Sequence, residues 1–238
     1  MRSSSSRLIR LAALPCLVAA VVLGLLAPAA TAAAKAKSTI RWTLPASPTA
    51  LDAFTLTGRL NLPGLETTGP RQIVISRGLP GGEQTPIAEV TTADDGTFSV
   101  TDAPPVGGFL FYSARWAGDD LFFGSARTIE VPVYHRRSGF VFSGPAQAVA
   151  GQPFEISVRL DGSGHVPTSN PTVWVYRAID DLPVTSLGTV TVADDGTFAI
   201  TDTPEIAGQY SYRLKWGGDA TFSAAIGSHA VTVTEPAG

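Results

Sequence analysis

The chain has 238 residues, of which 17 are Lys or Arg and 20 are Asp or Glu. Three of the basic residues lie in the first ten positions, so the remainder carries 14 basic against 20 acidic side chains, a balance of −6. This mild acidity, without a run of basic residues, makes nucleic acid a poor candidate partner.

The first 32 residues are typical of a secretory signal peptide. Arg2, Arg7 and Arg10 precede an apolar run over 11–26, and Ala30-Thr31-Ala32 supplies an A-x-A cleavage site. The run is shorter than the roughly 20 residues of a membrane span, so we expect a secreted, extracellular protein with no membrane association after cleavage. Lipid attachment at Cys16 is the weaker alternative, because the residue before it is proline. Cleavage removes this only cysteine, which excludes disulfides and thiolate sites.

The rest of the chain is an internal duplication. Residues 38–133 align with 138–233 without a gap, and roughly a third of the paired positions are identical. We therefore predict one module over 33–134 and a second over 139–238. The short linker between them, 135–138, contains no Gly or Pro and should restrict how freely the modules move.

Within each module the apolar residues alternate with a period of two, which predicts strands and no helix. The predicted strands of the second module are 139–143, 154–160, 172–177, 187–192, 197–201, 209–216 and 228–234. About seven short strands in 100 residues are typical of an immunoglobulin-like sandwich. The predicted fold class is therefore all-β, with two tandem immunoglobulin-like β-sandwiches.

One stretch, VTTADDGTFSV at 90–100, recurs as VTVADDGTFAI at 190–200. A three-residue loop would pair Val90 with Val100 and keep both on the buried face, whereas a two-residue loop would invert one arm. We therefore predict a hairpin whose turn uses glycine at positive φ and aspartate as a local hydrogen-bond acceptor. The predicted turn residues are Asp94, Asp95, Gly96, Asp194, Asp195 and Gly196.

The paired aspartates have two functional alternatives. Calcium needs six to eight oxygen ligands, and the stretch lacks the spacing of a calcium loop, so a weak site at the tips stays an open but minor alternative. A catalytic acid pair would need a carboxyl group in an apolar cleft. We assign no metal, no cofactor and no catalytic residue.

Residues 101–125, TDAPPVGGFLFYSARWAGDDLFFGS, and 201–223, TDTPEIAGQYSYRLKWGGDATFS, carry a family resemblance. With the A-D-G-T-F-S hairpin they resemble the bacterial immunoglobulin-like repeats of secreted and cell-surface proteins, especially those of actinobacteria. The resemblance implies a spacer, adhesion or binding role rather than a reaction. The tyrosine corner of immunoglobulin domains is matched poorly, since Tyr210 of the second copy is Leu110 in the first.

The same runs contain two Gly-Asp turns, Gly118-Asp119 and Gly218-Asp219. We expect each aspartate to accept hydrogen bonds from backbone N–H groups of its turn.

Aromatic residues that point outward differ between the copies. Trp174 and Tyr176 stand where the first copy has Val74 and Ser76. Conversely, Phe109 and Phe111 stand where the second copy has Gln209 and Ser211. Such residues can stack on sugars or pack on a partner protein, or they can pack against a loop or the other module.

Motifs of catalysis are missing from the sequence, which has no G-x-S-x-G, no H-E-x-x-H and no phosphate loop. The histidines, His135, His165 and His229, are too dispersed for a predicted zinc site. We therefore expect a non-enzymatic module with a structural, adhesion or protein-interaction role. The alternative is a carbohydrate-binding protein, so the expected partner is an unknown protein or a cell-surface polysaccharide.

Overall fold

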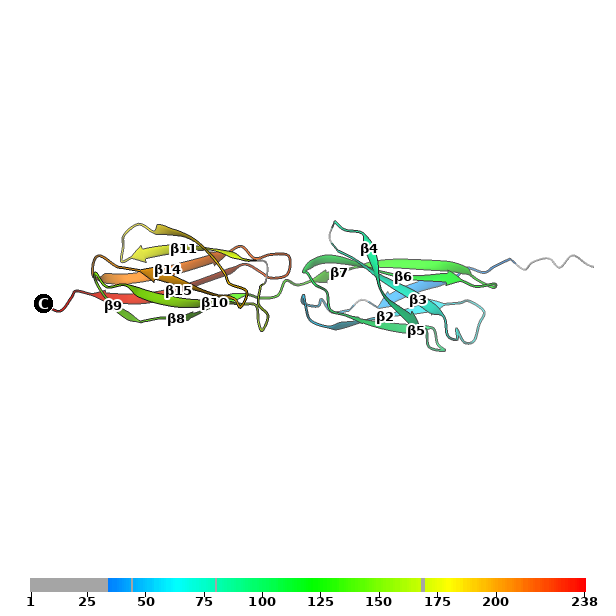
Figure 1. Cartoon of the computed structure of the whole chain (residues 1–238). Helices are drawn as coiled ribbons and strands as arrows, with labels where there is room; N and C mark the ends of the chain where they lie inside the picture. Colours follow the sequence, from blue (N-terminus) through cyan, green and yellow to red (C-terminus); the bar gives the residue numbers. More distant parts are fainter. Residues whose placement is uncertain (1–33, 44, 80, 168–169) are drawn as a thin grey trace, which may run out of the picture. The chain divides into compact units, whose positions relative to one another are not determined.

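A computed structural model describes residues 34–238 except 44, 80 and 168–169, and the predicted signal peptide lies outside this part. The described residues form strands and no helix, arranged as two β-sandwiches (Figure 1). The predicted fold class is confirmed. The strands of the first sandwich are β1 (Thr39–Thr43), β2 (Phe54–Asn61), β3 (Gln72–Gly78), β4 (Gln84–Thr91), β5 (Thr97–Asp102), β6 (Gly108–Gly118) and β7 (Phe123–Val133). Those of the second are β8 (Gly139–Ser143), β9 (Gln147–Val149), β10 (Phe154–Asp161), β11 (Thr172–Ile179), β12 (Thr185–Thr191), β13 (Thr197–Asp202), β14 (Gly208–Trp216) and β15 (Ala225–Thr234).

Each sandwich closes its own hydrophobic core between two sheets whose strands are antiparallel, apart from β9 of the second sandwich. In the first, the sheet β1-β2-β5 faces the sheet β4-β3-β6-β7. Leu56 of β2 and Ile73 of β3 are fully buried, while their neighbours along each strand are more exposed, as a period of two requires. In the second, β13-β10-β8 faces β12-β11-β14-β15-β9, with Ile156 and Val173 in the corresponding places.

The seven strands predicted for the second module are all present, with bounds that differ by three residues at most. The prediction missed β9, which has only three residues and pairs in parallel with the end of β15. There the N–H of Thr232 donates to the carbonyl of Ala146 at 2.9 Å. Pro132 occupies the equivalent position in the first module and has no N–H, so only an isolated bridge between Thr49 and Tyr134 forms.

The structure corrects the predicted hairpin. The three-residue loop is present, since Ala93 N–H donates to Thr97 O at 2.8 Å and Gly96 has a φ of 85°. However, β4 and β5 do not pair with each other: Val90 lies opposite Ile73, and Val100 lies opposite Leu56. The expected pairing of Val90 with Val100 is wrong because the chain crosses from one sheet to the other at this loop. Both side chains still point inward, each from its own layer.

Arg136, within the predicted linker, is buried. Its Nε donates to Ala50 O at 3.1 Å, its Nη1 donates to Ser163 O at 3.1 Å, and its Nη2 pairs with Asp52. Position 136 also forms an isolated bridge with Phe222. Arg136 is therefore held by hydrogen bonds of its side chain and by pairing of its main chain.

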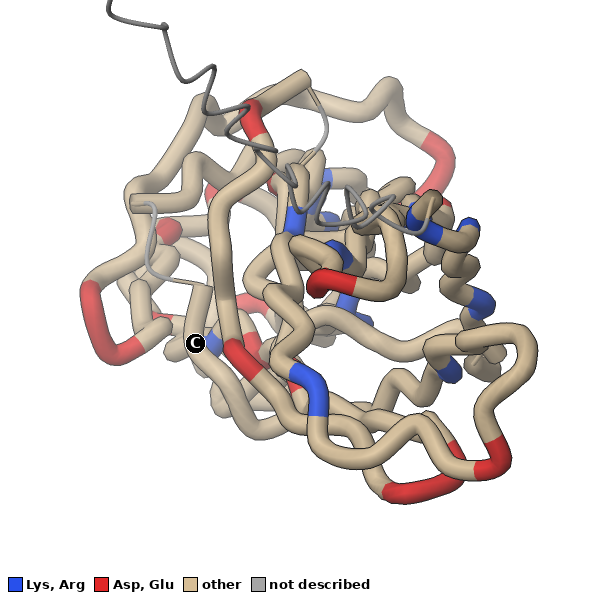
Figure 2. The backbone as a smooth tube through the Cα atoms, turned by 90° about the vertical axis from the view of Figure 1, so that its right-hand side faces the viewer, with Lys and Arg blue, Asp and Glu red and all other residues tan. Residues whose placement is uncertain are grey.

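The surface charges are dispersed. Figure 2 shows acidic residues mainly on loops and turns, with Lys and Arg scattered along the chain. Within the described part of the chain, no helix has the length and apolar character needed to cross a membrane.

Candidate functional site

A cluster of three polar side chains joins the two sheets of the first module. Arg77 Nη1 of β3 donates to Asp102 of β5, with distances of 2.8 and 2.9 Å to the two carboxylate oxygens. The hydroxyl of Tyr112, on β6, donates to Asp102 Oδ2 at 2.6 Å. Because β5 belongs to one sheet and β3 and β6 to the other, the carboxylate is a polar link across the sandwich.

The second module repeats this cluster with Arg177, Asp202 and Tyr212. The Arg177 Nη1 to carboxylate distances are 2.9 and 2.8 Å, and the Tyr212 hydroxyl lies 2.5 Å from Asp202 Oδ2. Neither cluster is among the sites predicted from the sequence, although Arg and Asp are separated by 25 residues in each copy. That repeated spacing, with the aspartate in the T-D-x-P motif, was the available signal.

The electrostatics of the clusters favour a structural role. Burial, reinforced by the hydrogen bond to the carboxylate, raises the pKa of Tyr112 and Tyr212 far above the usual value of about 10. The hydrogen bond to Asp202 also raises the pKa of Arg177, so the guanidinium stays charged. The Nε atoms of Arg77 and Arg177 are buried without a hydrogen-bond partner. Because each phenol stays neutral, its hydroxyl donates a hydrogen bond to a carboxylate that also forms an ion pair with arginine.

The aspartates at the loop tips accept hydrogen bonds from the threonine two residues further along the same loop. Asp95 Oδ1 accepts from the N–H of Thr97 at 2.9 Å and from its hydroxyl at 2.7 Å. Asp195 has the same two bonds with Thr197, at 2.9 and 2.6 Å. The side-chain and backbone hydrogen bonds from the threonine lower the pKa of each aspartate below its ordinary value. Among the residues that the structure describes, no group of three or more His, Cys, Asp or Glu is placed to hold a metal ion.

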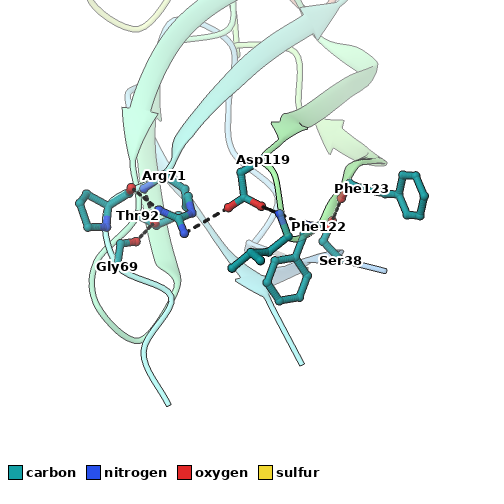
Figure 3. Close-up of polar contacts among 9 residues, drawn as sticks. Ser38, Gly69, Arg71, Thr92, Asp119, Phe122 and Phe123 are labelled. Atoms are coloured by element: carbon teal, nitrogen blue, oxygen red, sulfur yellow. Dashed lines mark hydrogen bonds and ion pairs between the residues drawn. The ribbon is translucent and has the colours of Figure 1, made fainter. Parts of the chain in front are cut away.

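The Gly-Asp turn of the first module is part of a larger polar cluster (Figure 3). Asp119 Oδ1 accepts from the N–H groups of Leu121 and Phe122, both at 2.9 Å. Its Oδ2 lies 3.2 Å from Arg71 Nη2, and Thr92 Oγ1 accepts from the backbone N–H of Arg71 at 2.9 Å. Gly118, before the aspartate, has a φ of 91°.

The second module keeps the turn and changes its surroundings. Asp219 Oδ1 accepts from the N–H groups of Thr221 and Phe222 at 2.8 Å, and Gly218 has a φ of 78°. Arg71 and Thr92, however, are replaced by Pro171 and Val192. The contacts with Arg71 and Thr92 thus belong to the first module, and the turn itself is common to both.

The outward aromatics form two separate pairs, one in each module. Phe109 and Phe111 are 59% and 37% exposed on one face of β6, opposite Pro132 and Glu130 of β7. Trp174 is 42% exposed on β11. Tyr176, in contrast, is half-buried.

The neighbours of the second pair are basic. Lys215 of β14 lies opposite Trp174, and Arg213 lies opposite Tyr176. The Trp174 face therefore combines an exposed aromatic ring with cationic cross-strand neighbours, which the Phe109 face lacks.

A shallow groove runs over the β8-β10-β13 sheet of the second module, with a volume of about 810 Å³. Val141, Val190 and Ala199 are among its lining residues. The equivalent groove of the first module has about 530 Å³ and includes Arg41 and Ser99. The duplicated surface is therefore more apolar in the second module.

Structural details also correct the expectation about the tyrosine corner. The hydroxyl of Tyr210 donates to the backbone carbonyl of Ile206, four residues upstream, at 2.9 Å. This is the hydrogen bond that defines such a corner. The second module therefore has it, and Leu110 prevents it in the first.

No protein-family model and no curated protein matches the sequence. Among solved structures, Salmonella α2-macroglobulin matches with 11% identity and a TM-score of 0.38, over 83% of this chain and 16% of that one. Red sea bream transglutaminase matches with 14% identity and a TM-score of 0.36, over 82% and 31% of the two chains. A superoxide reductase from Ignicoccus hospitalis has 15% identity and a TM-score of 0.32, over 40% and 80%. At these values the similarities carry no argument about function.

Proposed function

We propose that this chain is a secreted, non-enzymatic tandem module that binds another protein through the outer face of β6. The observation that supports the proposal most directly is the exposure of Phe109 and Phe111 side by side on one strand face. Large exposed aromatic side chains are costly to keep in water and are enriched at protein interfaces.

The duplication supplies an internal comparison. Gln209 and Ser211 hold the equivalent positions on β14, and that strand pairs with its neighbours in the same way. The fold therefore does not require phenylalanine at these two positions. A role outside the fold accounts for Phe109 and Phe111 better than a role in packing.

The test is a capture experiment with the secreted chain on a solid support, using culture medium of the producing organism. We expect specific proteins to be retained by the wild type and lost with Phe109→Gln/Phe111→Ser, which installs the residues of the second module. The matched control is Trp174→Val/Tyr176→Ser, which installs those of the first module on β11. Equal retention by the wild type and the phenylalanine variant would overturn the proposal.

A second candidate function is binding of a cell-surface polysaccharide through Trp174. Its exposed ring lies on a sheet face beside Lys215 and Thr189, an arrangement in which a sugar ring can stack while polar groups contact its hydroxyls. Retention on insoluble polysaccharides that is lost in Trp174→Val and kept in Phe109→Gln/Phe111→Ser would favour this candidate. A glycan array without any retained sugar would eliminate it.

A further inference from the structure

The open edge of the first module is formed by β7 and β1. β7 is the last strand of its sheet, and β1 is the first strand of the opposite sheet. A groove of about 740 Å³ lies between them, lined by residues 39–42 of β1 and 127–130 of β7. Figure 1 shows β7 at the margin of its sheet. An edge strand of this kind offers backbone hydrogen-bonding groups to a further strand.

The position of Pro132 indicates which backbone N–H groups of β7 point toward this edge and away from β6. The equivalent Thr232 donates its N–H outward to Ala146, and proline is tolerated in a strand where no ladder partner needs its N–H. The pairing of β6 with β7 has no register shift from Ser125 to Val133. With a period of two, the N–H groups of residues 126, 128 and 130 therefore face the groove edge. In the described part of the chain, none of these N–H groups donates to a group outside its own sheet.

The corresponding place in the second module is filled. Gly227 lies under the rings of Phe140 and Phe142, so close that a Cβ atom there would be 3.2 and 3.1 Å from them. The end of the same edge is paired with β9. The first module has Arg127 in place of Gly227, and at the end of the edge it forms only the isolated bridge between Thr49 and Tyr134. β9 also shows that the equivalent edge of β15 pairs with a further strand over residues 232–234.

The groove has an apolar floor and a basic rim. Ile40 is buried, and Trp42 and Ile129 are half-buried. The Trp42 indole is held in place by donating from Nε1 to Arg127 O at 3.0 Å. Arg41 and Arg127 are exposed, and neither is ion-paired within the described residues. Glu130 is the single acidic residue that lines the groove.

We propose that this groove binds an extended peptide segment of a partner protein by strand addition to β7. The peptide presents apolar side chains to Trp42 and Ile129 at alternate positions, and an acidic side chain to Arg41 and Arg127. Backbone hydrogen bonds to the edge supply affinity, and the pockets for alternate side chains supply specificity. This site is distinct from the Phe109 face, so either proposal can fail while the other stands.

The test uses a synthetic peptide of alternating threonine and valine, in which one central valine is replaced by glutamate. Nuclear magnetic resonance of the ¹⁵N-labelled secreted chain should show shifted signals and slower hydrogen exchange for the amides of Ala126, Thr128 and Glu130. The same peptide with lysine in place of glutamate should bind about three-fold more weakly, the size expected of an exposed ion pair. Equal affinity of the two peptides, or no protection of these amides at millimolar peptide, would overturn the proposal.

Two variants separate strand addition from non-specific adsorption. Thr128→Pro removes one edge N–H and should weaken binding of the glutamate peptide about tenfold. Its matched control is Ser228→Pro at the equivalent edge position of β15, which should bind the peptide as the wild type does. Arg127→Gly, the residue of the second module, should reduce the preference for glutamate over lysine, and Arg41→Gln/Arg127→Gly should abolish it. Unchanged binding by Thr128→Pro would contradict the proposal, and the exchange measurement on the wild type stands even if this variant unfolds.

Discussion

Arg77 Nη1 lies 2.8 Å from Oδ1 and 2.9 Å from Oδ2 of Asp102, which links β3 of one sheet to β5 of the other. Both side chains are largely buried, at 19% and 12% exposure. Loss of the carboxylate would leave the guanidinium buried without its counter-charge. We expect Asp102→Ala to lower the free energy of unfolding by on the order of 3 kcal/mol. Urea denaturation measures this change, and Arg77→Met/Asp102→Leu should be less destabilising than Asp102→Ala alone.

The phenols of Tyr112 and Tyr212 predict a decline of stability at alkaline pH. Burial raises the folded-state pKa of both, so the unfolded chain loses these protons first. The stabilisation is therefore complete below about pH 10, the ordinary tyrosine value, and is lost as the pH rises above it. Unfolding free energies measured from pH 8 to 11 should fall less steeply for Tyr112→Phe/Tyr212→Phe than for the wild type. An equal pH dependence of the unfolding free energy in the wild type and the variant would show that the pKa of these two phenols does not change on unfolding.

Gly96 is the position in the loop where a side chain should be tolerated least. Its φ is 85°, and a Cβ atom would lie 2.2 Å from the carbonyl oxygen of Leu60. Gly64 has a similar φ of 88° with nothing within 4 Å, so it serves as the matched control. We expect Gly64→Ala to cost about 1 kcal/mol from the backbone conformation alone, and Gly96→Ala clearly more. Thermal unfolding compares the two, and equal costs would mean that the loop moves away from Leu60.

The carboxyl group of Asp95 should titrate at unusually low pH because of Thr97. Both the hydroxyl and the N–H of Thr97 donate to Asp95 Oδ1. Thr97→Val keeps the N–H and removes the hydroxyl, which is the largest cause of the lowered pKa. Carbon-detected titration should therefore show a higher pKa of Asp95 in this variant. Thr197→Val should have the same effect on Asp195 and none on Asp95.

Gly58 and Trp42 should be coupled energetically. A Cβ atom at Gly58 would lie 2.4 Å from the ring of Phe98, which packs edge-on against Trp42. The second module has Val158 and Phe142 at these positions, paired in the same register. We expect Gly58→Val to cost about 1–3 kcal/mol, the usual range for overpacking, and Trp42→Phe in the same chain to recover part of it. Strictly additive effects in a double-mutant cycle would exclude the coupling.

Much of the fold could be predicted from local pattern. The alternation that buries Leu56 and Ile73 has a period of two whatever the partner strand, and the 100-residue repeat gives the same pattern twice. The loop at Asp94–Asp95–Gly96 follows from the preference of glycine for positive φ and of aspartate for local acceptance of N–H groups. The exposed positions of Phe109, Phe111 and Trp174 follow from the same alternation.

Strand pairing and the polar clusters depended on the tertiary structure. Sequence spacing made Val90 and Val100 neighbours in one hairpin, yet the chain changes sheets between them and each pairs with a different strand. Asp102 reaches Arg77 and Tyr112 only because the two layers stack, which brings residues 25 and 10 positions apart within hydrogen-bond distance. The open groove beside β7 likewise exists because β1 belongs to the opposite sheet. A period of two determines which side of a strand is buried, but it carries no information about which strand lies next to it.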